Sequence, residues 1–119
     1  MITEHDRRHE LLRDYLTAAT SNAREVAHSL RLVMESFLRV AYPAHFPPGT
    51  MLSQFRGVCE QRVGTPRRIL NQMDIDELHD LTEYANLFHH DSNPAWQSQH
   101  INDAELLDHV SRTLAFTRR

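Results

Sequence analysis

The chain has 119 residues, of which 40% are hydrophobic and 24% are charged, and its formal net charge is −3. These values are typical of one compact domain, and they exclude a disordered tail and a broad surface that binds nucleic acid by charge alone. The single cysteine, Cys59, excludes an intrachain disulfide and a cysteine-based zinc cluster.

The chain contains no apolar run that is long enough to span a bilayer, and its first ten residues are too polar for a signal peptide. We therefore expect a cytoplasmic protein without a membrane partner. A reducing compartment also suits a lone thiol. Cys59 is expected to be a small buried residue rather than a nucleophile.

The first part of the chain predicts two helices. Residues 3–18 have Thr3 as a cap, and residues 23–41 follow a break at 20–22 in which Asn22 is the cap. The apolar side of the first helix consists of Leu11, Leu12, Tyr15 and Leu16. Apolar residues of the second helix recur at spacings of three and four, which is typical of a central buried helix: Val26, Leu30, Val33, Phe37 and Val40.

Proline and glycine mark the middle of the chain as a loop that precedes a shorter helix. Residues 42–49 cannot continue a helix, because proline lacks a backbone donor and restricts the residue before it. Thr50 is predicted to cap a helix that ends near Arg62. Its apolar positions are Met51, Leu52, Phe55, Val58 and Cys59. After a turn at 64–66, residues 67–73 are expected to form a short helical piece.

The next predicted helix begins at Asp74, with Glu77 three residues later, and its fourth turn contains His89 and His90. Its apolar stripe consists of Ile75, Leu78, Leu81, Ala85 and Phe88. Residues 91–100 are predicted to form a polar loop in which Trp96 is anchored on the core.

Asn102 is predicted to cap the last helix, which packs through Leu106, Leu107, Val110, Leu114 and Phe116. No segment has the alternating pattern of a strand, and no glycine-rich phosphate loop or internal repeat is present. The sequence therefore predicts one all-α domain over residues 1–119, a bundle of about five helices.

Two groups of polar residues are candidates for chemistry. Two adjacent histidines, His89 and His90, are a candidate acid/base site, because histidine both gives and takes protons near neutral pH. In the alternative interpretation, one ring is a hydrogen-bonded core residue and the other is solvated. The second group is a polar stripe on the helix over 23–41: Arg24, His28, Arg31, Glu35 and Arg39. Solvated ion pairs on an exposed face are the alternative for this stripe.

Three segments together resemble a known family. They are LRLVMESFLRVAYP at 30–43, IDELHDLTEYANLFHHDSNPAW at 75–96 and INDAELLDHVSRTLAF at 101–116. The pattern resembles the C-terminal domain of RloC- and PrrC-type ATPase-linked anticodon nucleases, which belong to the HEPN superfamily. The resemblance covers roughly residues 30–116 and includes no ATPase, so it implies a terminal or free-standing domain of a larger ATPase-linked protein.

The resemblance implies a HEPN-like fold and a metal-independent ribonuclease without a cofactor, acting on tRNA in phage defence. It also implies a homodimer and an ATPase module as a partner. The implied catalytic residues are Arg31 and Glu35 on one helix with His89 or His90 on a later one. Arg31 would bind the phosphate, and His90, with His89 as its neighbour or substitute, would transfer the proton. Candidate contacts to the RNA are Arg24, His28, Arg39 and Asp91.

Three alternatives stay open at this stage. The first is a noncatalytic helical module for dimerisation or interaction, which is favoured by the lack of an arginine shortly before His89. The second is a metal site formed by His89, His90 and Asp91, with His45 as a further ligand, although adjacent histidines on a helix point about 100° apart. The third is a helix surface for nucleic acid along residues 24–39.

Overall fold

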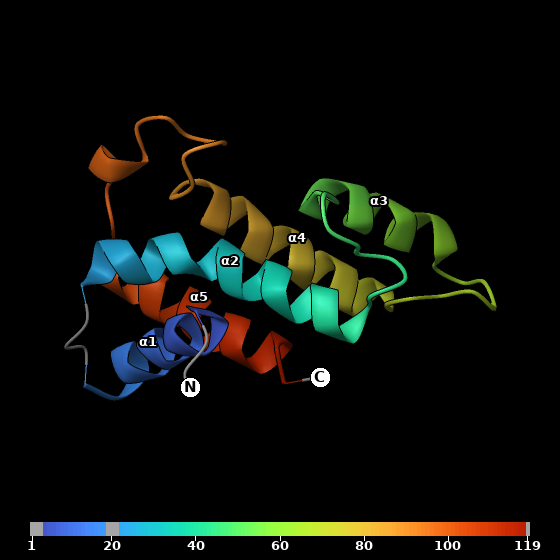
Figure 1. Cartoon of the computed structure of the whole chain (residues 1–119), viewed down its shortest axis with the longest axis horizontal. Coiled ribbons are helices and arrows are strands. Elements are labelled where there is room, and N and C mark those ends of the chain that lie inside the picture. The colour runs from blue at the N-terminus through green and yellow to red at the C-terminus, as the bar shows by residue number, and fades with distance from the viewer. Residues whose placement is uncertain (1–3, 19–21, 119) are drawn as a thin grey trace.

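The protein is all-helical, as a computed structural model that describes residues 4–18 and 22–118 shows. Within these ranges the chain forms five α-helices and one short 3-10 helix, and it forms no strand (Figure 1). The elements are α1 (Glu4–Ala18), α2 (Ala23–Ala41), α3 (Leu52–Arg62), α4 (Gln72–Asn86), η1 (Trp96–Ser98) and α5 (Asp103–Phe116). The prediction of an all-α bundle of about five helices is confirmed.

Helix α2 occupies the middle of the bundle. It contacts α1, α4 and α5, whereas α3 packs on α4 at the far side from α1 (Figure 1). The core consists of two hydrophobic clusters, and α2 contributes to both. The first half of α2 lies in the cluster with α1, α5 and the end of α4, and its second half lies in the cluster with α3 and the rest of α4. Members of the first cluster include Leu12, Val26, Leu30, Leu106 and Val110, and members of the second include Leu38, Phe46, Phe55, Cys59 and Leu78.

Asparagine caps begin three of the helices. The side chains of Asn22 and Asn102 accept backbone N–H groups at the starts of α2 and α5, as predicted. The predicted start of α4 at Asp74 is wrong, because Asn71 is the cap and accepts the Asp74 N–H at 2.8 Å. The prediction that Thr50 caps α3 is also wrong, because the residue at the cap position is Met51.

The backbone N–H of Met51 donates to Gln54 Oε1 at 2.9 Å, which satisfies the donor at the start of α3. Two earlier expectations, the Thr3 cap and the break at 20 and 21, lie outside the described residues. The separate helical piece expected over 67–73 is not formed, because turns and bends occupy residues 67–70 and residues 72 and 73 begin α4. One of these turns is closed by a bond from the Arg68 N–H to the Thr65 carbonyl at 3.2 Å.

Helix α4 ends at Asn86, before the two histidines that were expected in its fourth turn, so His89 and His90 lie in the turns that follow. The N–H groups of Leu87 and Phe88 bond to carbonyls three residues back, which tightens the chain out of the α-helix. The side chain of Asn93 then donates to the Leu87 carbonyl at 2.9 Å. The loop after α4 is thereby folded back toward the helix that it leaves.

Several residues predicted to be apolar contacts are exposed instead. Val40 is 82% exposed, because it follows the buried Leu38 by two positions and therefore points to nearly the opposite side of α2. Leu16 and Leu107 directly follow the buried residues Tyr15 and Leu106, and a step of one residue turns a side chain by about 100°. Met51 is exposed because it precedes the first turn of α3.

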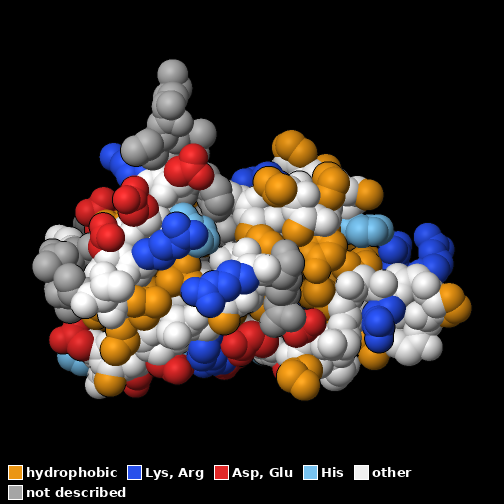
Figure 2. All heavy atoms as spheres, turned by 90° about the horizontal axis from the view of Figure 1, so that it is seen from below, with side chains coloured by type: hydrophobic (Ala, Val, Ile, Leu, Met, Phe, Trp, Pro, Cys, Tyr) orange, Lys and Arg blue, Asp and Glu red, His pale blue; other side chains and the backbone are white. Residues whose placement is uncertain are grey.

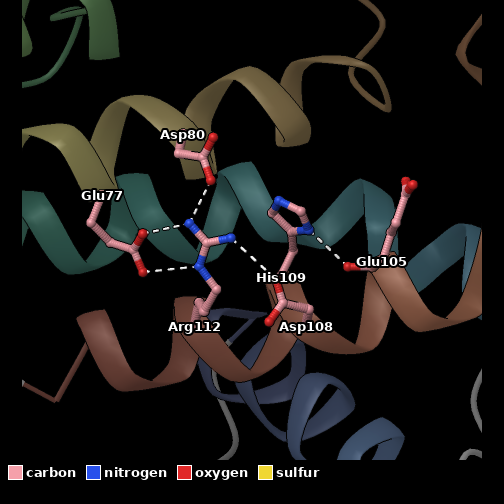
Figure 3. Close-up of polar contacts among 6 residues, drawn as sticks. All are labelled: Glu77, Asp80, Glu105, Asp108, His109 and Arg112. Carbon is pink, nitrogen blue, oxygen red and sulfur yellow. Dashed lines mark hydrogen bonds and ion pairs between the residues drawn. The ribbon is translucent and has the colours of Figure 1, made fainter.

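A polar network joins α4 to α5 (Figure 3). Arg112 of α5 donates to both carboxylate oxygens of Glu77 and to Asp80 on α4, and it also bonds to Asp108 at 3.1 Å. The hydrogen bond from Arg112 lowers the pKa of the Asp80 carboxyl below its ordinary value. Because the guanidinium contacts two carboxylates of α4 and one of its own helix, it fixes the middle of α4 against α5.

The surface of the described residues agrees with the low net charge. Figure 2 shows acidic, arginine and hydrophobic side chains interspersed on the face seen from below, without a continuous basic surface. Cys59 is buried, and burial raises the pKa of its thiol to about 11, which agrees with a core residue. Across the described ranges, none of the helices combines the length and apolar character that crossing a bilayer requires.

Candidate functional site

Arg31 and Glu35 lie one helical turn apart on α2 and form an ion pair. Their side chains are only 11% and 13% exposed, and Arg31 Nε lies 3.7 Å from Glu35 Oε2. An ion pair on a solvated face would leave both side chains open to water. The pair is therefore part of an interior polar site rather than the exposed stripe that was the alternative interpretation.

The Arg31 guanidinium connects α2 with the end of α4. Its NH1 group donates to Ser92 Oγ at 3.1 Å and, at the longer distance of 3.4 Å, to Asn86 Oδ1. Asn86 is the last residue of α4, and Ser92 lies in the loop beyond it. The charge of Arg31 is thus held at the place where α4 ends.

The imidazole of His89 lies in the same region. Its side chain is 15% exposed, and its Nδ1 accepts the Asp91 backbone N–H at 3.3 Å. Burial lowers the pKa of His89 below the ordinary value, and the nearby Arg31 charge lowers it further. The negative charges of Asp91 and Glu35 raise the pKa of His89, but their effect is smaller than that of burial. His89 is therefore within electrostatic reach of both members of the ion pair on α2.

His28 and Trp96 form a stacked wall beside His89. The His28 ring stacks on Trp96 with centroids 4.5 Å apart, and its centroid lies 5.8 Å from that of His89. Its Nδ1 donates to the Phe88 carbonyl at 2.9 Å. Trp96 was expected to anchor on the core, but its partner is this partly buried imidazole of α2.

Arg24 secures the loop that carries Trp96. Its guanidinium donates to the carbonyls of Trp96 at 2.8 Å and Gln99 at 2.6 Å. Two backbone acceptors therefore occupy this guanidinium, which has a role in holding the loop against α2. The sequence had suggested a contact with RNA for Arg24.

The remaining candidate residues lie apart from this group. His90 is 77% exposed, and its Nδ1 lies 3.7 Å from Asp91 Oδ1. Arg39 is exposed, and its guanidinium carbon lies 5.7 Å from the centre of the Phe46 ring. The structure thus gathers Arg31, Glu35, His28 and His89, and it leaves His90 and Arg39 on the surface.

A small cavity opens beside Arg31. It has a volume of about 120 Å³, and it is bounded by residues of α2, α3, α4 and the loop after α4. The polar side chains along its wall include Arg56, His79, Thr82, Asn86 and Ser92. The site consequently has two compartments, the cavity and the group of rings around His89, and Arg31 belongs to both.

Sequence reasoning missed the residues of α4 that line this cavity, although a pattern was present. His79, Thr82, Glu83 and Asn86 follow at spacings of three, one and three, so they share one face of a helix. A polar face opposite an apolar stripe is ordinary on a surface helix. Here that face meets α2 and α3. Ser92 and Trp96, in contrast, have no local pattern that would reveal their contacts.

Metal chemistry has no geometric support in the described residues. No group of three or more histidine, cysteine, aspartate or glutamate side chains there is arranged to hold a metal ion. His89 is largely buried, whereas its neighbour His90 points into solvent. The metal site considered for His89, His90, Asp91 and His45 is therefore not formed.

Comparisons with family models, with curated proteins and with solved structures found no match to this chain. The geometry around Arg31 and His89 is accordingly the basis for the functional proposal.

Proposed function

We propose that this chain is a metal-independent endoribonuclease domain of the HEPN-like type. The observation that supports the proposal is the position of Arg31, Glu35 and His89. Arg31 and Glu35 are four positions apart on α2, and His89 follows Glu35 by 54 positions, yet the fold brings the guanidinium, the carboxylate and the imidazole of lowered pKa to one largely buried place. Metal-independent RNA cleavage requires these chemical groups, and perturbed histidines tend to occur at functional sites.

The proposed reaction is an attack of the ribose 2′-oxygen on the neighbouring phosphorus. His89 is neutral at pH 7, because its pKa is lowered. Its unprotonated Nδ1 accepts the Asp91 N–H in the free protein, and in the reaction it exchanges this contact for the 2′-hydroxyl and accepts its proton. The imidazolium then returns a proton to the 5′-oxygen as the phosphorus–oxygen bond breaks. Arg31 stabilises the negative charge that develops on the phosphate, and Glu35 orients Arg31. The products are a 2′,3′-cyclic phosphate and a 5′-hydroxyl.

The first prediction concerns cleavage by single variants. Incubation of the purified protein with RNA and EDTA should yield fragments with these ends. Arg31→Ala and His89→Ala should each lower the cleavage rate by about 10²- to 10⁴-fold, because each removes a group that acts in the transition state. His90→Ala should cause a smaller loss than His89→Ala, because the His90 ring is exposed. Denaturing gel electrophoresis of labelled RNA measures these rates.

His100→Ala is the matched control, since His100 is an exposed histidine outside the site. It should cleave at the wild-type rate. Circular dichroism should show that every variant is folded. Equal rates for wild type, Arg31→Ala and His89→Ala would refute the proposed site, and a metal requirement would refute the proposed mechanism.

For the substrate we propose tRNA, as the resemblance to anticodon nucleases implies. Cleavage of total tRNA should be faster than cleavage of an unstructured RNA of the same length. The resemblance likewise implies a homodimer and an ATPase partner, and light scattering of the purified chain addresses the first of these. Both are parts of the proposal.

A noncatalytic interaction module is the second candidate function. The observation that favours it is the exposure of large apolar side chains, of which Val40, Met73 and Met51 are more than half exposed. Such side chains are suited to contact with another protein. A folded wild-type chain that self-associates but cleaves no RNA would support the module and refute the nuclease.

A further inference from the structure

Apart from Arg31, the residues that line the cavity have no role in the reaction proposed above. The cavity lies between α2, α3 and α4, and its volume of about 120 Å³ is several times the space that one water molecule needs. Two of its lining residues are arginines, Arg31 and Arg56, and the one acidic residue in its wall is Glu83. The side chains around the cavity therefore carry a positive balance of charge.

Two buried donors in this wall have no acceptor. Among the described residues, buried side-chain atoms without a hydrogen-bond partner are Arg31 Nε and Thr82 Oγ1, and both residues line the cavity. The Glu35 carboxylate, at 3.7 Å from Arg31 Nε, is too far for a hydrogen bond. Leaving such a group unsatisfied costs about 1–3 kcal/mol. Because both residues line the cavity, a rotation of either side chain would turn its unsatisfied donor toward an oxygen acceptor placed there.

Arg56 is held in position on the α3 side of the cavity. One of its N–H groups bonds to His79 Nδ1 of α4, and its NH1 atom lies 3.9 Å from Glu60 Oε1. A guanidinium can only donate, so His79 accepts this bond through Nδ1. Arg56 has five N–H donors in all, and most of them are not used in this contact. The guanidinium is thus oriented and has donors for a ligand.

We propose that this cavity binds a phosphate group of the RNA backbone, next to the phosphate that is cleaved. This inference rests on the proposed function, because it assigns a neighbouring subsite to the same substrate. Arg56 binds this phosphate from α3, and Arg31 of α2 contacts both this phosphate and the one that is cleaved. The Thr82 hydroxyl turns to donate to one of its oxygens. A guanidinium binds phosphate oxygens through paired N–H groups, and this geometry suits an anion better than a neutral ligand.

The binding test uses a short 2′-O-methyl RNA, which cannot be cleaved by attack of the 2′-oxygen. Arg56→Gln should weaken its binding about tenfold, since hydrogen bonds to charged groups are lost. The slope of log affinity against log salt concentration should decrease by about 0.7, as expected for one lost contact to a single strand. Arg62→Gln is the matched control, because Arg62 belongs to α3 but lies outside the cavity. Its affinity should equal that of the wild type.

Thr82→Val provides a second variant that does not depend on charge. Valine has nearly the same shape and removes the hydroxyl that has no partner. The free protein should therefore be as stable as the wild type or more stable, whereas the affinity for the RNA should decrease. A residue with only a structural role would show the opposite effect on stability. Inorganic phosphate added to the wild type should also shift the amide resonance of Thr82 in NMR spectra, and this shift should be lost in Arg56→Gln.

The outcomes separate this inference from the proposed function. Unchanged RNA affinity in Arg56→Gln, or equal losses in Arg56→Gln and Arg62→Gln, would overturn the phosphate subsite while cleavage by Arg31 and His89 could stand. A wild type that binds phosphate at Thr82 but cleaves no RNA would refute the nuclease and keep the phosphate site. If the chain is a nuclease and the cavity binds a phosphate of its substrate, Arg56→Gln should raise KM about tenfold and leave kcat within about twofold of the wild type.

Discussion

His89 shows how position within the fold changes an ordinary side chain. Its ring is mostly buried, the Asp91 N–H orients it, and the Arg31 charge opposes its protonation. His90 has the same chemistry one residue later, but solvent surrounds it. The adjacent pair thus contains one perturbed histidine and one exposed histidine, and only the first has the environment of a proton-transfer residue.

The second prediction follows from the causes of the His89 shift. NMR titration should give His89 a pKa below the ordinary value of about 6.5. Arg31→Gln should raise this pKa, since it removes a positive charge, but should not restore it fully, since burial is the larger cause. Arg39→Gln is the matched control on the same helix and should leave it unchanged. A His89 pKa that is equal in all three proteins would contradict the Arg31 contact.

The third prediction gives the sign of the effect of His89 on stability. Because its pKa is lower in the folded state than in the unfolded chain, the unfolded chain binds more protons in the window below about pH 6.5. The contribution of neutral His89 is therefore present above this pH and is lost as the pH falls through the folded pKa. Urea denaturation at pH 7.5 and pH 5 should show a larger loss of stability in the wild type than in His89→Gln.

At the scale of elements, α4 is the helix whose position determines the site. It contributes the wall of the cavity, and its end carries Asn86 toward Arg31. On another face, Arg112 of α5 bonds to Glu77 and Asp80 (Figure 3). The network of Arg112 therefore stabilises α4 through residues that do not line the cavity. It affects the site only by holding the backbone of α4 in place.

The fourth prediction concerns this network. Arg112→Met should decrease the free energy of unfolding by about 1–2 kcal/mol, which is less than for a fully buried ion pair, because the side chain is partly exposed. Arg118→Met serves as a control near the end of the chain and should have almost no effect. The pKa of Asp80 is lowered in the folded state by its hydrogen bond from Arg112. The contribution of Asp80 to the free energy of unfolding is therefore fully present above the ordinary carboxyl pKa, and it is lost as the pH falls through the folded pKa. Urea denaturation measures the difference, and equal stability of Arg112→Met and wild type would contradict it.

The element boundaries show what local sequence could predict. Asn22 and Asn102 were recognised as caps because each directly precedes a periodic apolar segment with acidic residues in its first turn. Asn71 was missed because Asp74 and Glu77 have the spacing of a capping arrangement and stand closer to the apolar stripe. The end of α4 was missed because Phe88 is buried like the stripe before it, although it lies outside the helix.

At the scale of the whole molecule, α2 joins the two hydrophobic clusters into one core. Its apolar residues in the first half belong to the cluster with α1 and α5, and those in the second half belong to the cluster with α3 and α4. Neither cluster can lose its packing without exposing part of the same helix. A chain of this size with a shared central helix is expected to unfold in one transition.

The fifth prediction compares matched core variants. Leu12→Ala removes a fully buried leucine from the first cluster, and Leu78→Ala removes one from the second. Each should decrease the free energy of unfolding by about 2–5 kcal/mol. Unfolding should remain a single transition in both variants, when it is followed by circular dichroism and by calorimetry. A separate early transition in only one variant would show that the clusters unfold independently.

Only part of the site could be predicted from sequence, for a physical reason. Arg31 and Glu35 were found because helical spacing places residues four apart on one face. Contacts of Arg31 with Asn86 and Ser92, and of Arg56 with His79, join residues on different elements. They depend on how the helices pack, which periodicity does not specify. The same limit applies to His89 and His90, whose different burial follows from the tight turns after Asn86.

The stack of His28 on Trp96 has an optical consequence. Trp96 is the single tryptophan of the chain, and its indole lies against an imidazole beside His89. Indole emission responds to the polarity and charge of its immediate neighbours, so the tryptophan fluorescence of this protein originates at the candidate site. Changes of protonation or occupancy around His89 are thereby converted into a spectroscopic signal, without any attached dye.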